Sequence, residues 1–112
     1  MRKIEKQMLQ ALMERKNIHI SNTEVQCHTV PHLFCAVYLF GNLIATVRPD
    51  SVTVTNCGYR TATTKSRLHV ILREFCGACL SQNNFEWYIT TPDDVIPMQD
   101  RVNYTIKRVP LF

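Results

Sequence analysis

The chain has 112 residues, a length that predicts a single domain over residues 1–112. Hydrophobic residues make up 46% of the sequence and charged residues 20%, which argues against a disordered chain. Thirteen Lys and Arg against nine Asp and Glu give a net charge of +4, a modest excess whose placement matters more than its size. No apolar run approaches the roughly 20 residues of a membrane-spanning helix, and no apolar stretch follows the charged N-terminus to make a signal peptide.

The first two predicted elements are a helix and a strand. Apolar residues recur every four positions from Ile4 to Leu12, which predicts a helix over residues 1–17 with one apolar stripe. Asn17 is expected to end this helix in a left-handed conformation. Residues 22–29 alternate between apolar and polar side chains, a pattern typical of a half-exposed strand at the edge of a sheet.

Residues 33–56 predict a three-stranded antiparallel meander. Gly41 and Asn42 both tolerate positive φ, so they predict a two-residue hairpin turn that pairs Phe40 with Leu43. A second turn over residues 48–51 is expected to close where Val47 meets Val52. One face is then uniformly apolar and expected to lie under helices: Ala36, Tyr38, Phe40, Leu43, Ala45, Val47, Val52 and Val54. The opposite face, which carries Cys35, Val37 and Leu39, is expected to be partly solvated.

A second helix is predicted from Thr63 or Thr64 to about Cys76, with Gly77 as its stop. Residues 85–90 predict a further strand with Phe85, Trp87 and Ile89 on one side. Residues 91–100 predict a loop, and residues 102–109 a last short strand or an ordered tail. The fold class is therefore α+β, with an antiparallel sheet of about four strands, two helices on one face, and the order α-β-β-β-β-α-β.

The second helix carries a basic face. Lys65, His69 and Arg73 recur at four-residue spacing opposite the apolar stripe, Arg67 flanks them, and Arg60 lies in the preceding loop. Such a patch predicts non-enzymatic binding of DNA or RNA through phosphate contacts. The alternative is a solvated helix face without a partner. The candidate nucleic-acid-binding residues are Arg60, Lys65, Arg67, His69 and Arg73.

The five cysteines are an odd number and, without a signal peptide, predict reduced thiols in a reducing cytosol. His32 and Cys35 together with Cys76 and Cys79 could supply four zinc ligands. We predict no metal and no cofactor, because the expected register points Cys35 away from the helix that carries Cys76. No nucleophile has a base at a recognisable spacing, so an enzyme is not expected.

Three segments resemble small uncharacterised proteins of tailed bacteriophages, including phages of marine hosts. They are RKIEKQM at residues 2–8, YLFGNLIA at residues 38–45 and CGYRTATTKSRL at residues 57–68, and the resemblance covers most of residues 1–90. It implies a phage gene product that acts in the cytoplasm of an infected bacterium, and it implies no particular chemistry. Beside nucleic-acid binding, the alternative function is to bind and modulate a host protein through an exposed sheet face or an edge strand.

Overall fold

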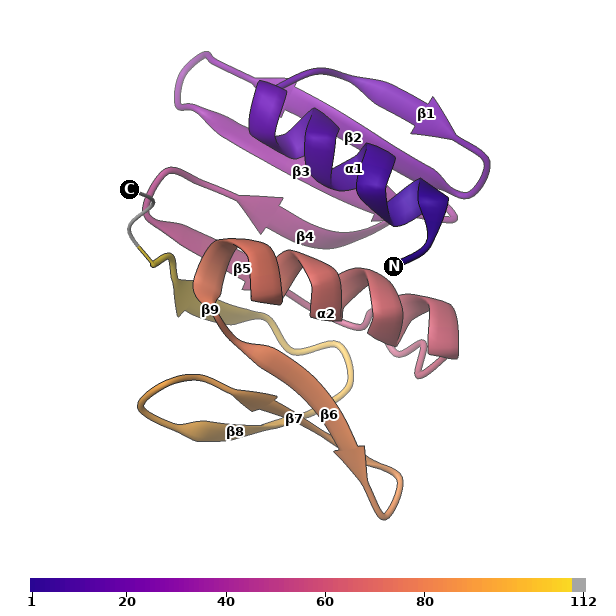
Figure 1. The fold of residues 1–112 in the computed structure, drawn as a ribbon, viewed down its shortest axis with the longest axis vertical. Coiled ribbons are helices and arrows are strands. Elements are labelled where there is room, and N and C mark those ends of the chain that lie inside the picture. Colours follow the sequence, from indigo (N-terminus) through magenta and orange to yellow (C-terminus); the bar gives the residue numbers. More distant parts are fainter. Residues whose placement is uncertain (110–112) are drawn as a thin grey trace.

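The computed structural model describes residues 1–109, which form two helices and two antiparallel sheets (Figure 1). The predicted α+β class is confirmed, although the sheets contain more strands than the sequence predicts. In chain order the elements are α1 (Lys3–Glu14), β1 (Ile18–Ile20), β2 (Thr23–His28), β3 (Phe34–Leu39), β4 (Asn42–Val47), β5 (Ser51–Val54), α2 (Ala62–Cys76), β6 (Cys79–Asn83), β7 (Glu86–Thr90), β8 (Val95–Met98) and β9 (Tyr104–Lys107).

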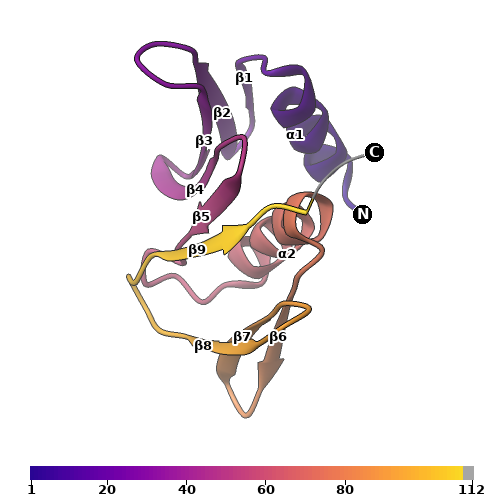
Figure 2. The same cartoon turned by 90° about the vertical axis from the view of Figure 1, so that its left-hand side faces the viewer.

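The larger sheet has six strands in the order β1-β2-β3-β4-β5-β9. Both helices lie on one face of this sheet, as predicted, and the turned view in Figure 2 shows its other face open. The smaller sheet, in the order β6-β7-β8, packs against α2 from a second side. Because α2 contacts both sheets, it has less free surface than a helix that covers a single sheet.

Helix α1 is shorter than predicted and ends before Asn17. Its C-cap is Arg15, whose φ of 56° is left-handed, and the Arg15 backbone N–H donates to the Ala11 carbonyl. Asn17 has a different role, because its Oδ1 accepts the backbone N–H of Cys27 at 2.7 Å. This contact ties the end of α1 to β2.

The N-cap of helix α2 lies two or three residues earlier than the predicted Thr63 or Thr64. Thr61 is the N-cap, and its Oγ1 accepts the backbone N–H of Thr64 at 3.1 Å, which satisfies one of the unpaired donors of the first turn. The predicted stop is confirmed, since Gly77 has a φ of 60° and its N–H donates to the Leu72 carbonyl.

The predicted register between β3 and β4 is wrong by one residue. Phe40 and Gly41 form the turn, with φ values of 50° and 79°, and Leu39 pairs with Asn42. A bulge then places Val37 opposite Ala45. Because side chains alternate along a strand, this shift moves the whole apolar set of β3 to the other face.

The shift decides which residues enter the core. The predictions for β4 and β5 are confirmed, since Ala45, Val47, Val52 and Val54 are buried. In β3 the buried face is Cys35, Val37 and Leu39, whereas Tyr38 is half-buried on the open face of the sheet. Phe40 is 72% exposed at the hairpin tip, and Leu43 is also exposed.

Other differences come from short strands that the sequence pattern does not reveal. Strand β1 pairs with β2, so β2 is internal and not an edge strand. The segment 91–100 is not only a loop, because β8 lies within it and pairs with β7. The last segment does contain a strand, β9, which pairs with β5. In β7 Trp87 and Ile89 lie on one side, as predicted, and both are buried, but Phe85 lies in the preceding turn and is 83% exposed.

Candidate nucleic-acid interface

The predicted basic face of α2 lies along β6 and is not an open surface. Lys65 Nζ donates to Gln82 Oε1 at 3.1 Å, and His69 Nδ1 accepts the backbone N–H of Leu80 at 3.1 Å. Arg73, at the C-terminal end of this face, is exposed. The expectation of a solvated face is wrong at His69, because the sequence pattern did not reveal the strand that covers it.

Arg67 is buried and belongs to the core. Its side chain is 3% exposed, and its NH1 donates to Glu5 Oε2 at 2.8 Å in an ion pair between α2 and α1. Its Nε donates to Thr23 Oγ1 at 3.1 Å, and its NH2 donates to Asn22 Oδ1 at 3.4 Å. A guanidinium with these partners holds the two helices and β2 together and is not available to a ligand.

Glu5 is the acidic centre of this network. Burial would raise the pKa of its carboxyl group, but hydrogen bonds from Ser66, Arg67 and the Arg2 backbone together hold that pKa below its ordinary value. Ser66 Oγ donates to Glu5 Oε2 at 2.6 Å. The pair is therefore charged at neutral pH and hydrogen-bonded on both sides.

Arg60 lies in the loop before α2 and is largely neutralised. Its Nε donates to Asp100 Oδ1 at 2.7 Å, its NH2 lies 3.8 Å from Glu86 Oε2, and its NH1 donates to the Phe85 carbonyl at 2.8 Å. The hydrogen bond from Arg60, followed by one from Asn56, lowers the pKa of Asp100. Arg60 thus joins the loop before α2 to the smaller sheet.

Most of the unpaired positive charge lies outside α2 and the loop before it. Of the thirteen Lys and Arg side chains, three (Lys16, Arg60 and Arg67) form ion pairs, which leaves ten without a carboxylate partner among residues 1–109. Four of the nine acids are used in those pairs, which leaves five. The unpaired charge of the described chain is therefore clearly positive.

Three of the unpaired arginines line one shallow depression at the end of α1, which we call the arginine hollow: Arg15, Arg48 and Arg108. Arg108 is fixed from two sides, because its NH1 donates to the Arg48 carbonyl at 2.9 Å and its Cζ lies 4.9 Å above the Phe75 ring. The remaining lining residues within the described chain carry no acid: Leu12, Leu33, Phe34, Cys35, Val47 and Pro49.

The guanidinium of Arg48 lies at the border of the hollow. Its NH1 donates to Thr53 Oγ1 at 2.8 Å, and Thr53 belongs to the open face of the larger sheet. Lys107 pairs with Ser51 in the neighbouring ladder and is exposed, so it adds a fourth cation to this end of the molecule. Each guanidinium offers planar paired donors to an anion with several oxygens, and that of Arg48 offers them on the side of the open face.

The sequence analysis did not find the arginine hollow. Its arginines come from the end of α1, from the turn before β5 and from the segment after β9, so no short segment holds two of them. Only the pairing of β5 with β9 brings Arg48 and Arg108 together. No local signal in the sequence could have indicated this.

A second depression lies between the β3–β4 hairpin and the loop before α2, and we call it the aromatic pocket. Its volume is about 290 Å³. Phe40 and Tyr59 border it, and both are exposed. The other lining residues are Leu39, Asn42, Ile44, Asn56, Thr61 and Thr64.

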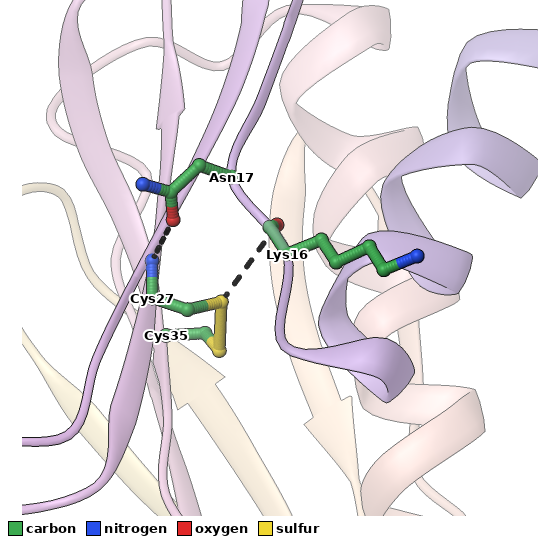
Figure 3. The surroundings of a disulfide bond; sticks show 4 residues. All are labelled: Lys16, Asn17, Cys27 and Cys35. Atoms are coloured by element: carbon green, nitrogen blue, oxygen red, sulfur yellow. Dashed lines mark hydrogen bonds between the residues drawn. A yellow bond between two sulfur atoms is a disulfide. The ribbon is translucent and has the colours of Figure 1, made fainter.

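The cysteines differ from the expectation of reduced thiols. Cys27 and Cys35 are directly opposite on β2 and β3 and form a disulfide (Figure 3). Figure 3 also shows Asn17 bound to the Cys27 backbone and the Lys16 carbonyl near the Cys27 sulfur, at 3.9 Å. Cys35 faces the helices and not away from them, so that part of the argument against zinc is wrong.

The zinc ligand set considered from the sequence does not assemble. Cys35 has its sulfur in the disulfide, so it cannot bind a metal as a thiolate. Burial raises the pKa of the Cys76 thiol to about 11. Within residues 1–109 no group of three or more His, Cys, Asp or Glu side chains lies close enough to hold a metal ion.

Comparison with known families decides the origin of the chain. Residues 1–107 match the family described as Kyanoviridae Gp96 protein. The chain belongs to this family. The resemblance to tailed-phage proteins is therefore confirmed, since Kyanoviridae are tailed phages of cyanobacteria. Comparison with curated proteins and with solved structures gives no match. Neither helix of the Gp96-family chain, over its described residues, is long and apolar enough to cross a membrane.

Proposed function

We propose that this Gp96-family protein is an accessory protein that binds nucleic acid in the host cytoplasm without catalysing a reaction. The observation that carries the proposal is the arginine hollow, where Arg15, Arg48 and Arg108 line one surface and no acid of the described chain lies among them. A phosphate group fits such a surface, because a guanidinium can donate to two of its oxygens at once. Of the residues predicted from the sequence, Lys65 and Arg73 keep partly exposed charges and extend the basic surface.

The expected binding is driven by charge and depends on salt. Each phosphate that a protein cation neutralises releases counterions, so the logarithm of the affinity falls with the logarithm of the salt concentration by about 0.9 per contact on duplex DNA. Contacts of this kind position the protein on the backbone and do not read the base sequence. Binding to unrelated sequences with similar affinity is the expected result.

The test measures binding of labelled DNA and RNA by fluorescence anisotropy over a salt series. We expect the double variant Arg15→Asn with Arg108→Gln to lower the salt slope by about one to two, as for the loss of one or two phosphate contacts. Asn is chosen at position 15 because it tolerates the left-handed backbone there. The control is Lys3→Gln with Lys6→Gln, which removes the same charge from the exposed side of α1. An equal decrease of the salt slope in both double variants would show that the attraction is diffuse and would contradict binding at the arginine hollow.

A second candidate function is binding of a host protein through the open face of the larger sheet. The observation that favours it is a row of small and polar side chains in register across five strands: Gln26, Ala36, Thr46, Thr53 and Thr105. Figure 2 shows no helix or strand over this face of the sheet, and Ala36 within the row is 3% exposed. A cyanobacterial protein retained from nuclease-treated lysate by the wild type, and lost with Thr46→Arg, would support it. Equal retention by both forms would count against it.

A further inference from the structure

Three aromatic rings of the described chain are exposed, and two of them, Phe40 and Tyr59, border the aromatic pocket. Phe40 is 72% exposed and Tyr59 is 54% exposed. Phe40 also has a φ of 50°, a left-handed conformation that is unusual for a bulky residue. Its backbone N–H donates to the Asn22 carbonyl at 2.8 Å, which fixes the tip of the hairpin. Phe85 shares this exposure and backbone conformation, so the position of Phe40 at the pocket is what distinguishes it.

The loop that carries Tyr59 is fixed in a similar way. Cys57 and Gly58 have φ values of 54° and 83°, and the Tyr59 N–H donates to the Asn56 carbonyl at 2.8 Å. Asn56 is fully buried, and its Oδ1 accepts the N–H groups of Gly58 and Arg101. The backbone that carries each ring is therefore fixed by hydrogen bonds before any ligand arrives.

The lining of the pocket fits a flat ring with a polar edge. Leu39 and Ile44 are buried apolar residues, and Asn42 and Thr61 are polar. The Asn42 amide forms no hydrogen bond with residues 1–109, so it offers a donor and an acceptor to a ligand. The volume of about 290 Å³ lies at the lower limit of ligand pockets and suits a single ring system of nucleoside size.

The charges next to the pocket favour a ligand with an anionic backbone. A Cβ on Gly58 would lie 3.0 Å from Arg101 Nε, so the Arg101 side chain lies against Gly58, one residue before Tyr59. Within the described residues Arg101 has no carboxylate partner. Lys65 follows the lining residue Thr64, and its only described partner is the neutral Gln82. The two acids beside Arg60, Asp100 and Glu86, both form ion pairs with it.

We propose that the aromatic pocket binds one unstacked nucleobase of a single-stranded nucleic acid, between the rings of Phe40 and Tyr59, with Arg101 and Lys65 near the adjoining phosphates. This inference rests on the proposed function and adds a preference to it. A base inside a duplex cannot enter the pocket, whereas a base in a single strand can stack on aromatic side chains. The protein therefore prefers single strands, and the pocket supplies that preference.

The experiment compares a labelled 12-nucleotide dT strand with a duplex of equal length, in the full chain, by fluorescence anisotropy. Phe40→Asn removes one ring and keeps a residue that accepts positive φ, and Tyr59→Ser removes the other. Each is expected to weaken single-strand binding about tenfold or more, because stacking on one aromatic side chain is worth about that factor. Duplex binding and the salt slope are expected to stay unchanged.

Phe85→Asn is the matched control, because Phe85 is also exposed and left-handed at a hairpin tip but does not line the pocket. It is expected to bind like the wild type. If wild-type protein binds single strands and both pocket variants bind them equally well, the base pocket is refuted while the proposed function stands. If the wild type binds neither the single strand nor the duplex at low salt, both the base pocket and the proposed function are refuted. Emission of the single, buried Trp87 verifies that each variant is folded.

Discussion

The buried ion pair between Glu5 and Arg67 makes the sharpest prediction about stability. The Glu5 side chain is 1% exposed and that of Arg67 is 3% exposed, and their N–O distance is 2.8 Å. Replacing Glu5 by Gln keeps the shape of the side chain and removes its charge. Arg67 then stays charged in a site with little water, where its remaining partners are the neutral Thr23 and Asn22.

The expected loss of unfolding free energy in Glu5→Gln follows from this buried environment. Removing one partner of a buried pair costs about 3–5 kcal/mol, and the amide oxygen of Gln can still accept one hydrogen bond, so we expect a loss of about 3 kcal/mol. A domain of this length unfolds with about 6–17 kcal/mol, so the loss is a large fraction of its stability. With a urea m-value of about 2 kcal/mol/M, the unfolding midpoint falls by roughly 1.5 M.

The assay is urea unfolding followed by Trp87 emission at pH 7. Glu14→Gln is the control, because Glu14 is exposed in its ion pair with Lys16 and its loss is expected to leave the unfolding free energy nearly unchanged. Exchanging both Glu5 and Arg67 for Met is expected to restore most of the stability. Equal losses in Glu5→Gln and Glu14→Gln would refute the reasoning.

The same pair predicts a dependence on pH. The pKa of Glu5 is lowered in the folded chain relative to its ordinary value of 4.5, so the unfolded chain binds a proton more readily. The stabilisation by the ionised Glu5 carboxylate is therefore complete above about pH 5, and it is lost as the pH falls through the pKa of Glu5 in the folded chain. The difference in stability between wild type and Glu5→Gln is expected to shrink over that acidic range, and a constant difference would contradict the assignment.

Three further predictions concern the core and the cysteines. Val37→Asp is expected to abolish folding while Tyr38→Asp remains folded by circular dichroism, since only Val37 faces the helices; the reverse outcome would restore the register predicted from the sequence. Replacing Cys27 and Cys35 by Ser is expected to lower the unfolding free energy by about 2–3 kcal/mol, because the disulfide closes a loop with a sequence separation of 8; no loss would show that the bond is absent. Cys76 is expected to resist iodoacetamide at pH 8 until urea unfolds the chain, as mass spectrometry would show, because burial raises its pKa to about 11.

The sequence predicts those turns and helix ends whose conformation is determined by a single local residue. The turn before β5 follows from Pro49, and the end of α2 follows from Gly77, and both are confirmed. The predicted turn of the β3–β4 hairpin is wrong. Phe40 takes a left-handed conformation that its side chain disfavours, so the turn lies one residue earlier than the Gly-Asn pair indicates. Tertiary contacts, such as the bond from Phe40 to Asn22, outweigh that local preference.

The candidate site is less predictable, for a different reason. A helical pattern shows which face is polar but not what lies against it. Arg67 and Arg73 look alike in the sequence, yet one is buried against Glu5 and the other is exposed. The difference arises from α1, whose first turn supplies the carboxylate from 62 positions away. A periodic sequence pattern does not reveal contacts across such a separation. For the same reason it does not reveal that Arg15, Arg48 and Arg108 line one depression.

The positions of the two depressions set the length of nucleic acid that can use both. The arginine hollow lies at the C-terminal end of α1, and the aromatic pocket is linked to the first turn of α1 through Phe40, Asn22, Arg67 and Glu5. With 12 residues, α1 spans about 18 Å. At about 3.4 Å for each nucleotide of a stacked strand, α1 alone corresponds to roughly five nucleotides, and the contacts from Glu5 to the pocket add to that length. If one strand occupies both depressions, affinity for oligo(dT) rises steeply up to about this length and only slowly beyond it. A smooth rise with no change of slope would mean that the two depressions bind independently.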